Sequence, residues 1–174
     1  MIYLKNNPIG LDAVIHVMQK QLHDNLSLKW GIDLESYPRC YTNYTENGTD
    51  IEHYTKKNDY ETVLFAEKSK FFFTAEEEIL KTGNLTFNTT AKLYFIVDLK
   101  KIKSLDHRAD EEVISDIVNE LESFSNISIK RIVRNKRNVF SNQMFRDLDN
   151  LEPYFVCLFD IDIIDYYINQ RICN

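Results

Sequence analysis

The sequence predicts an α+β fold in which two helices pack on a mainly antiparallel sheet. In residues 85–99 the odd positions are apolar or small and most even positions are polar, which is typical of one long strand with one face in the core and the other in water or against a partner. A second β-prone run, residues 154–164, is its expected companion. The 174 residues include only 4 glycines and 3 prolines, which disfavours an all-β sandwich with many tight turns.

The first predicted element is an amphipathic helix. Asn7 and Pro8 resemble a helix cap followed by proline at the first helical position. Glycine at position 31 can close the last turn. Apolar residues recur every three or four positions between these limits and form one stripe that can lie on a sheet: Leu11, Ile15, Met18, Leu22 and Leu26.

The middle of the chain predicts strands around a hairpin. Residues 37–54 are aromatic and polar, and Asn47-Gly48 is a strong turn signal, so we expect a strand on each side. Residues 60–66 predict another strand. After three consecutive phenylalanines, residues 74–77 match a capping box that could start a short helix. We expect residues 66–83 to project as a hairpin or excursion from a single domain covering residues 1–174.

The second half of the chain repeats the pattern of helix and strand. Residues 100–108 predict a polar connection, and acidic residues at 110–112 suit the N-terminus of a helix that continues to Leu121. A strand at 127–133 and a turn at 135–138 follow, and the last strand begins after Pro153. The second helix is therefore expected to pack on the same sheet as the first.

Composition narrows the class of protein. A formal net charge of -6 disfavours a general nucleic-acid binder, although local basic patches remain possible. Cys40, Cys157 and Cys173 are odd in number and far apart, which favours reduced thiols over a disulfide framework or a zinc site, with Cys157 in the core. No apolar run approaches about 18 residues, so neither a membrane span nor a signal peptide is expected.

Asp98, Asp160 and Asp162 are the main candidates for a metal site. Asp160 and Asp162 point the same way on one strand, and clustered carboxylates of this kind bind Mg²⁺ in nucleases. The alternative is the polar outer face of a half-exposed strand, which the alternation with Phe159, Ile161 and Ile163 favours. The histidines have no metal-ligand spacing, and no nucleophile grouping can be assembled, so no catalytic residue and no cofactor is expected.

Two sequence features are candidate interfaces. The first is the basic run Lys130, Arg131, Arg134, Lys136 and Arg137, which could contact nucleic acid, pair with an acidic neighbouring subunit, or form a solvated strand edge. The second is Phe71, Phe72 and Phe73: a strand sends consecutive residues to both faces, so one or two of these rings could meet another protein. The alternative is burial of all three.

The order of elements resembles tail-completion proteins of tailed bacteriophages, the tail-terminator and neck ring proteins. The similarity rests on the N-terminal helix, residues 37–41 (Tyr-Pro-Arg-Cys-Tyr), the long hairpin, residues 93–99, the helix from Asp110, and the closing residues 151–155. A composition rich in Asn, Lys, Ile and Tyr suggests an AT-rich gene, as in crAss-like gut phages.

This resemblance implies a small tail-terminator-like subunit without catalysis, made in the host cytoplasm and located in the virion. It implies a six- or twelve-fold ring between portal and tail that contacts other neck, portal or tail proteins and lets DNA pass without specific binding. The basic run, with Lys130, Arg134 and Arg137, would then face a neighbouring subunit and not the channel. The alternatives are a Mg²⁺-dependent nucleic-acid enzyme using the three aspartates and a module that binds nucleic acid or an acidic partner through the basic run.

Overall fold

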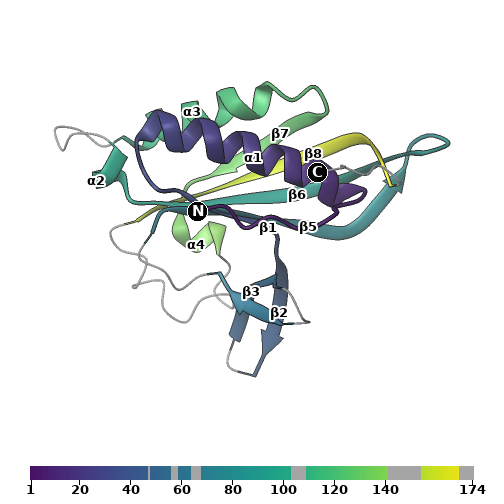
Figure 1. The fold of residues 1–174 in the computed structure, drawn as a ribbon, viewed down its shortest axis with the longest axis horizontal. Helices are drawn as coiled ribbons and strands as arrows, with labels where there is room; N and C mark the ends of the chain where they lie inside the picture. The colour runs from purple at the N-terminus through teal and green to yellow at the C-terminus, as the bar shows by residue number, and fades with distance from the viewer. Residues whose placement is uncertain (47, 56–58, 64–67, 103–108, 141–153, 169–174) are drawn as a thin grey trace.

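The protein has an α+β fold with two sheets (Figure 1). The computed structural model describes residues 1–46, 48–55, 59–63, 68–102, 109–140 and 154–168. The larger sheet has five strands in the order β1-β5-β6-β8-β7, and the smaller has three in the order β2-β3-β4. The elements in chain order are α1 (Leu11–Trp30), β1 (Glu35–Arg39), β2 (Tyr41–Thr45), β3 (Gly48–Tyr54), β4 (Tyr60–Thr62), β5 (Lys70–Lys81), β6 (Thr86–Val97), α2 (Leu99–Ile102), α3 (Asp110–Glu122), β7 (Ile127–Val133), α4 (Lys136–Val139) and β8 (Phe155–Tyr167).

The first helix confirms the predicted stripe but begins later than expected. Its N-cap is Gly10, with φ 58°, and not Asn7. The Gly10 carbonyl accepts hydrogen bonds from the amides of Ala13 and Val14, and a Cβ on this glycine would lie 3.0 Å from the Ile168 carbonyl oxygen. The helix therefore starts after Gly10, where φ is positive and the chain passes close to the residue that follows β8, and not at Pro8. The helix ends as predicted, with Gly31 left-handed at φ 66°.

The long central strand β6 confirms the strongest sequence signal, and β8 is its antiparallel neighbour as expected. Odd residues of β6 and β8 face α1 and α3 and form the larger core cluster with Leu22, Leu26 and Ile117. Even residues near one end of the strands are also buried, against the small sheet and α4. The expectation of one buried face is therefore wrong for that half of β6, because a second layer covers it.

The structure of β5 differs from two of the expectations for residues 66–83. Its first half, residues 70–75, lies inside the main sheet between β1 and β6, so this part does not project. No short helix starts at Thr74; the pairing with β6 continues through residues 79–81 after an irregularity, because the ladder outweighs a local capping pattern. Only the far end of the β5–β6 hairpin reaches beyond its neighbours in Figure 1. Residues 66 and 67 lie outside the described ranges.

The C-terminal elements match the predicted pattern closely. The helix α3 buries Val113, Ile114, Ile117 and Leu121, and β7 occupies residues 127–133. The predicted turn at 135–138 contains the short helix α4. The main sheet is antiparallel except for β1, which runs parallel to β5. The hairpin predicted around Asn47-Gly48 is the pair β2 and β3, and the described part of the predicted 60–66 strand is β4.

Candidate interaction surfaces

The outer face of the small sheet exposes three tyrosines, Tyr41, Tyr54 and Tyr60, which we call the tyrosine face. The antiparallel register places Tyr54 opposite Tyr60 and Tyr41 opposite Glu52, so all three rings emerge on one side. The ring of Tyr60 stands nearly perpendicular to the other two, with centroids 6.1 Å from Tyr41 and 5.4 Å from Tyr54. The residues are 36%, 44% and 52% exposed in chain order, an unusual amount of aromatic surface for one small sheet.

The inner face of the small sheet is buried against the main sheet. Ile51 and Val63 join the second core cluster with Phe72, Tyr94 and Ile96 of the main sheet. Beside them His53 lies between two aromatic rings, with centroids 5.2 Å from Tyr3 and 4.9 Å from Tyr37. Burial lowers the pKa of His53, and nearby Glu61 opposes this only in part. The small sheet is therefore held in place by a packed inner layer.

A cation already lies on the tyrosine face. The Arg39 guanidinium is 5.3 Å from the centroid of the Tyr41 ring, within the range of a cation–π contact. Its Nε donates a 2.8 Å hydrogen bond to Asp12 of α1. Asp12 also pairs with Lys5. The carboxylate fixes the arginine so that its charged plane stays over the ring.

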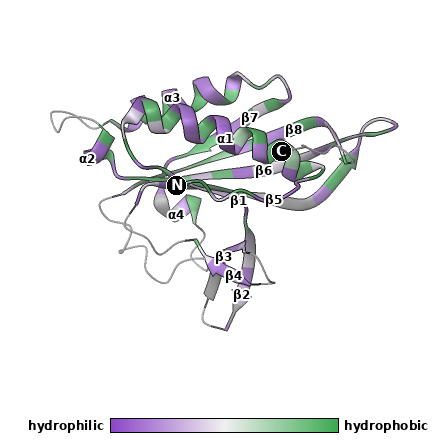
Figure 2. Cartoon of the chain, viewed as in Figure 1, coloured by the Kyte–Doolittle hydropathy of each residue, from purple (hydrophilic) through white to green (hydrophobic). Residues whose placement is uncertain are grey.

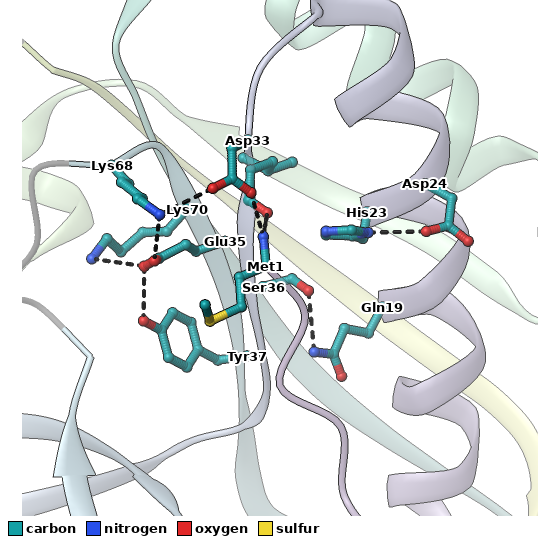
Figure 3. Close-up of polar contacts among 11 residues, drawn as sticks. Met1, Gln19, His23, Asp24, Asp33, Glu35, Ser36, Tyr37, Lys68 and Lys70 are labelled. Atoms are coloured by element: carbon teal, nitrogen blue, oxygen red, sulfur yellow. Dashed lines mark hydrogen bonds and ion pairs between the residues drawn. The ribbon is translucent and has the colours of Figure 1, made fainter.

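A buried polar cluster lies where the small sheet leaves the main sheet (Figure 3). The Tyr37 hydroxyl donates to Glu35 Oε2 at 3.0 Å, and Lys70 Nζ lies 3.8 Å from the same oxygen. Lys70 Nζ also donates to the Val63 carbonyl at 3.1 Å, which ties β5 to the residue after β4. Lys68 completes the group by lying 3.7 Å from Glu35 Oε1.

The pKa shifts and the burial of this cluster indicate that it holds the strands together and is not a reactive site. Burial lowers the pKa of Lys70, while Glu35 opposes the shift. Burial first, and then its hydrogen bond to Glu35, raise the pKa of Tyr37. Hydrogen bonds from the Met1 amine and Lys68 lower the pKa of Asp33, at the solvent side of the cluster, to about 2. Since Lys70 is 1% exposed, its amine is closed to a solute and serves to fix β1, β5 and the small sheet together.

Exposed apolar residues also lie at the far end of the β5–β6 hairpin. Ile79, Leu80 and Leu85, which we call the hairpin end, are 48%, 59% and 63% exposed. Pairing of Thr86 with Tyr167 brings the end of β8 to the same end of the sheet. Tyr167 and Ile168 are also exposed. Ile79 and Leu80 are consecutive on β5 and lie on opposite faces, so the hairpin end exposes apolar side chains on both of its faces.

The predicted basic interface is largely paired within the chain. Lys130 Nζ lies 2.8 Å from Asp162 Oδ1, Arg131 pairs with Asp160, and Arg134 pairs with Glu111 of α3. An irregularity in the pairing of β7 with β8, between Ile129 and Arg131, explains why neighbouring cations both reach aspartates of β8. The backbone of Lys136 and Arg137 lies in α4; their side chains are outside what the structure describes.

The three aspartates of the proposed metal site do not meet. Asp160 pairs in register with Lys92 and Asp162 with Thr90, whereas Asp98 follows the end of β6. Six residues of strand separate Lys92 from Asp98, which is about 20 Å. The two nearby aspartates have cationic partners instead of open positions, although Asp160 Oδ1 is buried without a hydrogen-bond partner in the described structure. In the described ranges no group of three or more His, Cys, Asp or Glu side chains could hold a metal ion.

The prediction that the phenylalanine triplet contributes to an interface is wrong. Phe71, Phe72 and Phe73 are each 0% exposed. Phe71 and Phe73 pack under the helices, with Phe71 stacked on Phe95 at 5.0 Å. Phe72 points to the opposite face and stacks on Tyr94 at 4.8 Å. A strand does send the rings to both sides, as predicted, but both sides of this strand are covered.

The tyrosine face is the feature that sequence reasoning missed. Hydropathy hides it, because tyrosine scores as slightly polar; Figure 2 accordingly draws little green on the small sheet. The available signal was alternation: Tyr41 and Tyr54 fall on the opposite parity from the buried Ile51 and His53 once the hairpin register is fixed. That register depends on pairing across the turn, which a single strand does not specify.

Comparisons with family models, with curated proteins and with solved structures find no match to this chain. Among the described residues, no helix is both long enough and apolar enough to cross a membrane. The surfaces of the molecule are therefore the basis for a functional proposal.

Proposed function

We propose that this chain is a structural subunit that assembles into a ring in the neck or tail of a tailed bacteriophage, without catalysis. The observation that carries the proposal is the exposure of large apolar or aromatic side chains at two places in different parts of the fold, the tyrosine face and the hairpin end. Soluble monomers commonly expose apolar residues singly, whereas gathered ones mark contact surfaces.

Two different contact surfaces suit a ring better than a two-fold dimer. A dimer with two-fold symmetry uses the same surface on both copies, whereas a head-to-tail contact joins one surface to a different one and closes into a ring when the rotation permits. The tyrosine face belongs to the small sheet and the hairpin end to the main sheet, so the two can meet different neighbours. Tyrosine is also enriched at subunit interfaces.

The order of elements supports a place among tail-completion proteins. An N-terminal helix and a second helix cover one face of a mainly antiparallel sheet, as the resemblance implies for a tail-terminator-like subunit. A net charge of -6 suits a ring through which DNA passes without sticking. We propose the virion neck or tail as its location, with portal, neck or tail proteins as its neighbours.

The test is the state of assembly of the purified protein. Light scattering after gel filtration and negative-stain electron microscopy are expected to reveal closed rings of several subunits, alone or after addition of virion components. Substituting Asp160→Asn is expected to leave ring formation intact. Particles that remain single under both conditions, or Mg²⁺-dependent nucleic-acid cleavage that is lost in the Asp160→Asn variant, would overturn the proposal.

A further inference from the structure

The tyrosine face has the chemistry of a site for cations. The ring of Tyr60 lies at 83° to the ring of Tyr41 and at 71° to the ring of Tyr54, so neither pair is stacked. Arg39 already occupies the face of Tyr41 within the same chain. The tyrosine farthest into solvent, Tyr60, is 52% exposed and lies between the other two.

Two carboxylates share the face of the small sheet that carries these rings. Glu52 is paired with Tyr41 across the hairpin, and Asp50 is paired with Asn43 one step further along the same face. The segment 41–63 carries five carboxylates against two lysines, Lys56 and Lys57. The carboxylates are Glu46, Asp50, Glu52, Asp59 and Glu61, and of these Glu61 is paired with the buried His53 and lies on the inner face. Exposed aromatic rings within a negative field attract Arg and Lys side chains.

The opposite charge gathers in one other stretch of the chain. Residues 130–137 contain five cations, and no acidic residue occurs between positions 127 and 146. This stretch begins on β7, the strand at the edge of the main sheet in the described structure. We propose that the tyrosine face binds the basic segment 130–137 of a second copy of this chain, an inference that rests on the proposed ring.

Arg134 is the cation best placed to enter this contact. Its partner within the chain, Glu111, has a side chain that is 66% exposed, and exposed ion pairs contribute only about 0–1 kcal/mol. Exchanging Glu111 for the tyrosine face of a neighbour therefore costs little. Arg131 differs, because its partner Asp160 is buried and would be left without its cation. The contact thus uses Arg134 and leaves Arg131 in place.

One copy cannot make this contact with itself. Arg134 pairs with α3, which covers the helical face of the main sheet. The small sheet lies on the other side of the main sheet, with the tyrosines on its outer face (Figure 1). Two different surfaces on opposite sides of one chain make a head-to-tail contact, which propagates from copy to copy and closes into a ring when the rotation between copies permits.

Two single substitutions test the contact from its two sides. Tyr60→Ala removes the central ring, and Arg134→Ala removes the cation; each is expected to raise the dissociation constant of the assembly roughly tenfold or more. Tyr44→Ala is the matched control for the ring, because Tyr44 is an 80% exposed tyrosine of the same sheet that lies off the tyrosine face by register. Lys20→Ala, an exposed cation of α1 away from both proposed contact surfaces, is the matched control for charge.

The deciding measurement mixes the two variants. Each alone keeps one intact half of the contact, so an equimolar mixture forms one native interface per pair and stops at a heterodimer of about 41 kDa, twice the 20.6 kDa chain. At a concentration between the dissociation constants of the wild type and of the variants, light scattering is expected to find large assemblies for the wild type and both controls, monomers for each variant alone, and this dimer for the mixture. Dimer formation also demonstrates that both variants are folded.

The other outcomes separate the two proposals. If the wild type assembles and Tyr60→Ala and Arg134→Ala assemble equally well, the tyrosine contact is wrong and the ring survives. If both variants are folded by circular dichroism, fail to assemble and yet form no dimer when mixed, the two surfaces do not meet each other. If the wild type stays monomeric at every concentration, the inference is overturned, and the ring then rests on assembly with virion components.

Discussion

Phe72→Ala decides whether the phenylalanine triplet belongs to the core. Phe72 is 0% exposed, stacks on Tyr94 at 4.8 Å with an interplanar angle of 11°, and belongs to the cluster that joins the small sheet to the main sheet. Removing a buried phenylalanine ring costs about 3–5 kcal/mol, since contacts are lost and a cavity remains. For a chain of this length each kcal/mol shifts Tm by about 2–4 °C, so a fall of roughly 6–20 °C is expected.

The assay is urea unfolding followed by tryptophan fluorescence and circular dichroism. Trp30 lies in the larger cluster and reports its packing. The matched control is Tyr44→Ala, an exposed aromatic residue whose removal is expected to change the free energy of unfolding by less than about 0.5 kcal/mol. A Phe72→Ala variant that keeps its stability but loses assembly would refute the burial argument and restore Phe72 as an interface residue.

Three further predictions follow from single contacts. Arg131→Met is expected to lower the free energy of unfolding by about 1–3 kcal/mol, a value discounted for the exposed guanidinium, because the buried Asp160 loses its cation. Urea unfolding measures this loss, and the double variant that also carries Asp160→Asn should regain most of it. The folded-state pKa values of His53 and His16 lie below 6.5, so the unfolded chain binds more protons than the folded chain as the pH drops below about 6.5, and the free energy of unfolding falls. The measurement is the unfolding midpoint as a function of pH, and its pH dependence should become weaker in the His53→Gln variant. Gly31→Ala is expected to cost about 1–2 kcal/mol, and Gly31→Asn less, since φ is 66° with open space around the Cβ position; thermal unfolding of both variants measures the difference.

The periodicity of apolar residues correctly predicted the helices and strands that bury one face, and it failed for strands whose second face is also covered by another layer of the fold. The helix stripe and the alternation of residues 85–99 identified α1 and β6 because each element alone determines which of its residues share a face. The strand β5 was missed because Phe71, Phe72 and Phe73 give no alternation when both faces are buried. The local pattern at Thr74 then suggested a helix that pairing with β6 overrides.

Candidate surfaces were harder to predict than the fold for a related reason. A charge run is visible in sequence, but its partners are not: the carboxylates that pair with Lys130 and Arg134 lie 32 and 23 positions away, on β8 and α3. The tyrosine face has the opposite difficulty. Its members come from three short strands, and only the register of β2, β3 and β4 brings them together.

The register of the main sheet also explains where its second layer stops. One row across β5, β6 and β8 is apolar and covered by the small sheet and α4, and it consists of Phe72, Tyr94 and Leu158. The next row on the same face is polar, and it consists of Thr74, Lys92 and Asp160. Because β8 changes at Asp160 from a continuous apolar run to alternation of aspartate and isoleucine through Ile163, its sequence marks the edge of the cover. A partner that meets this side of the molecule therefore encounters charged side chains on this row of the main sheet and the three exposed rings of the tyrosine face on the small sheet, which is why the tyrosine face is the surface to test.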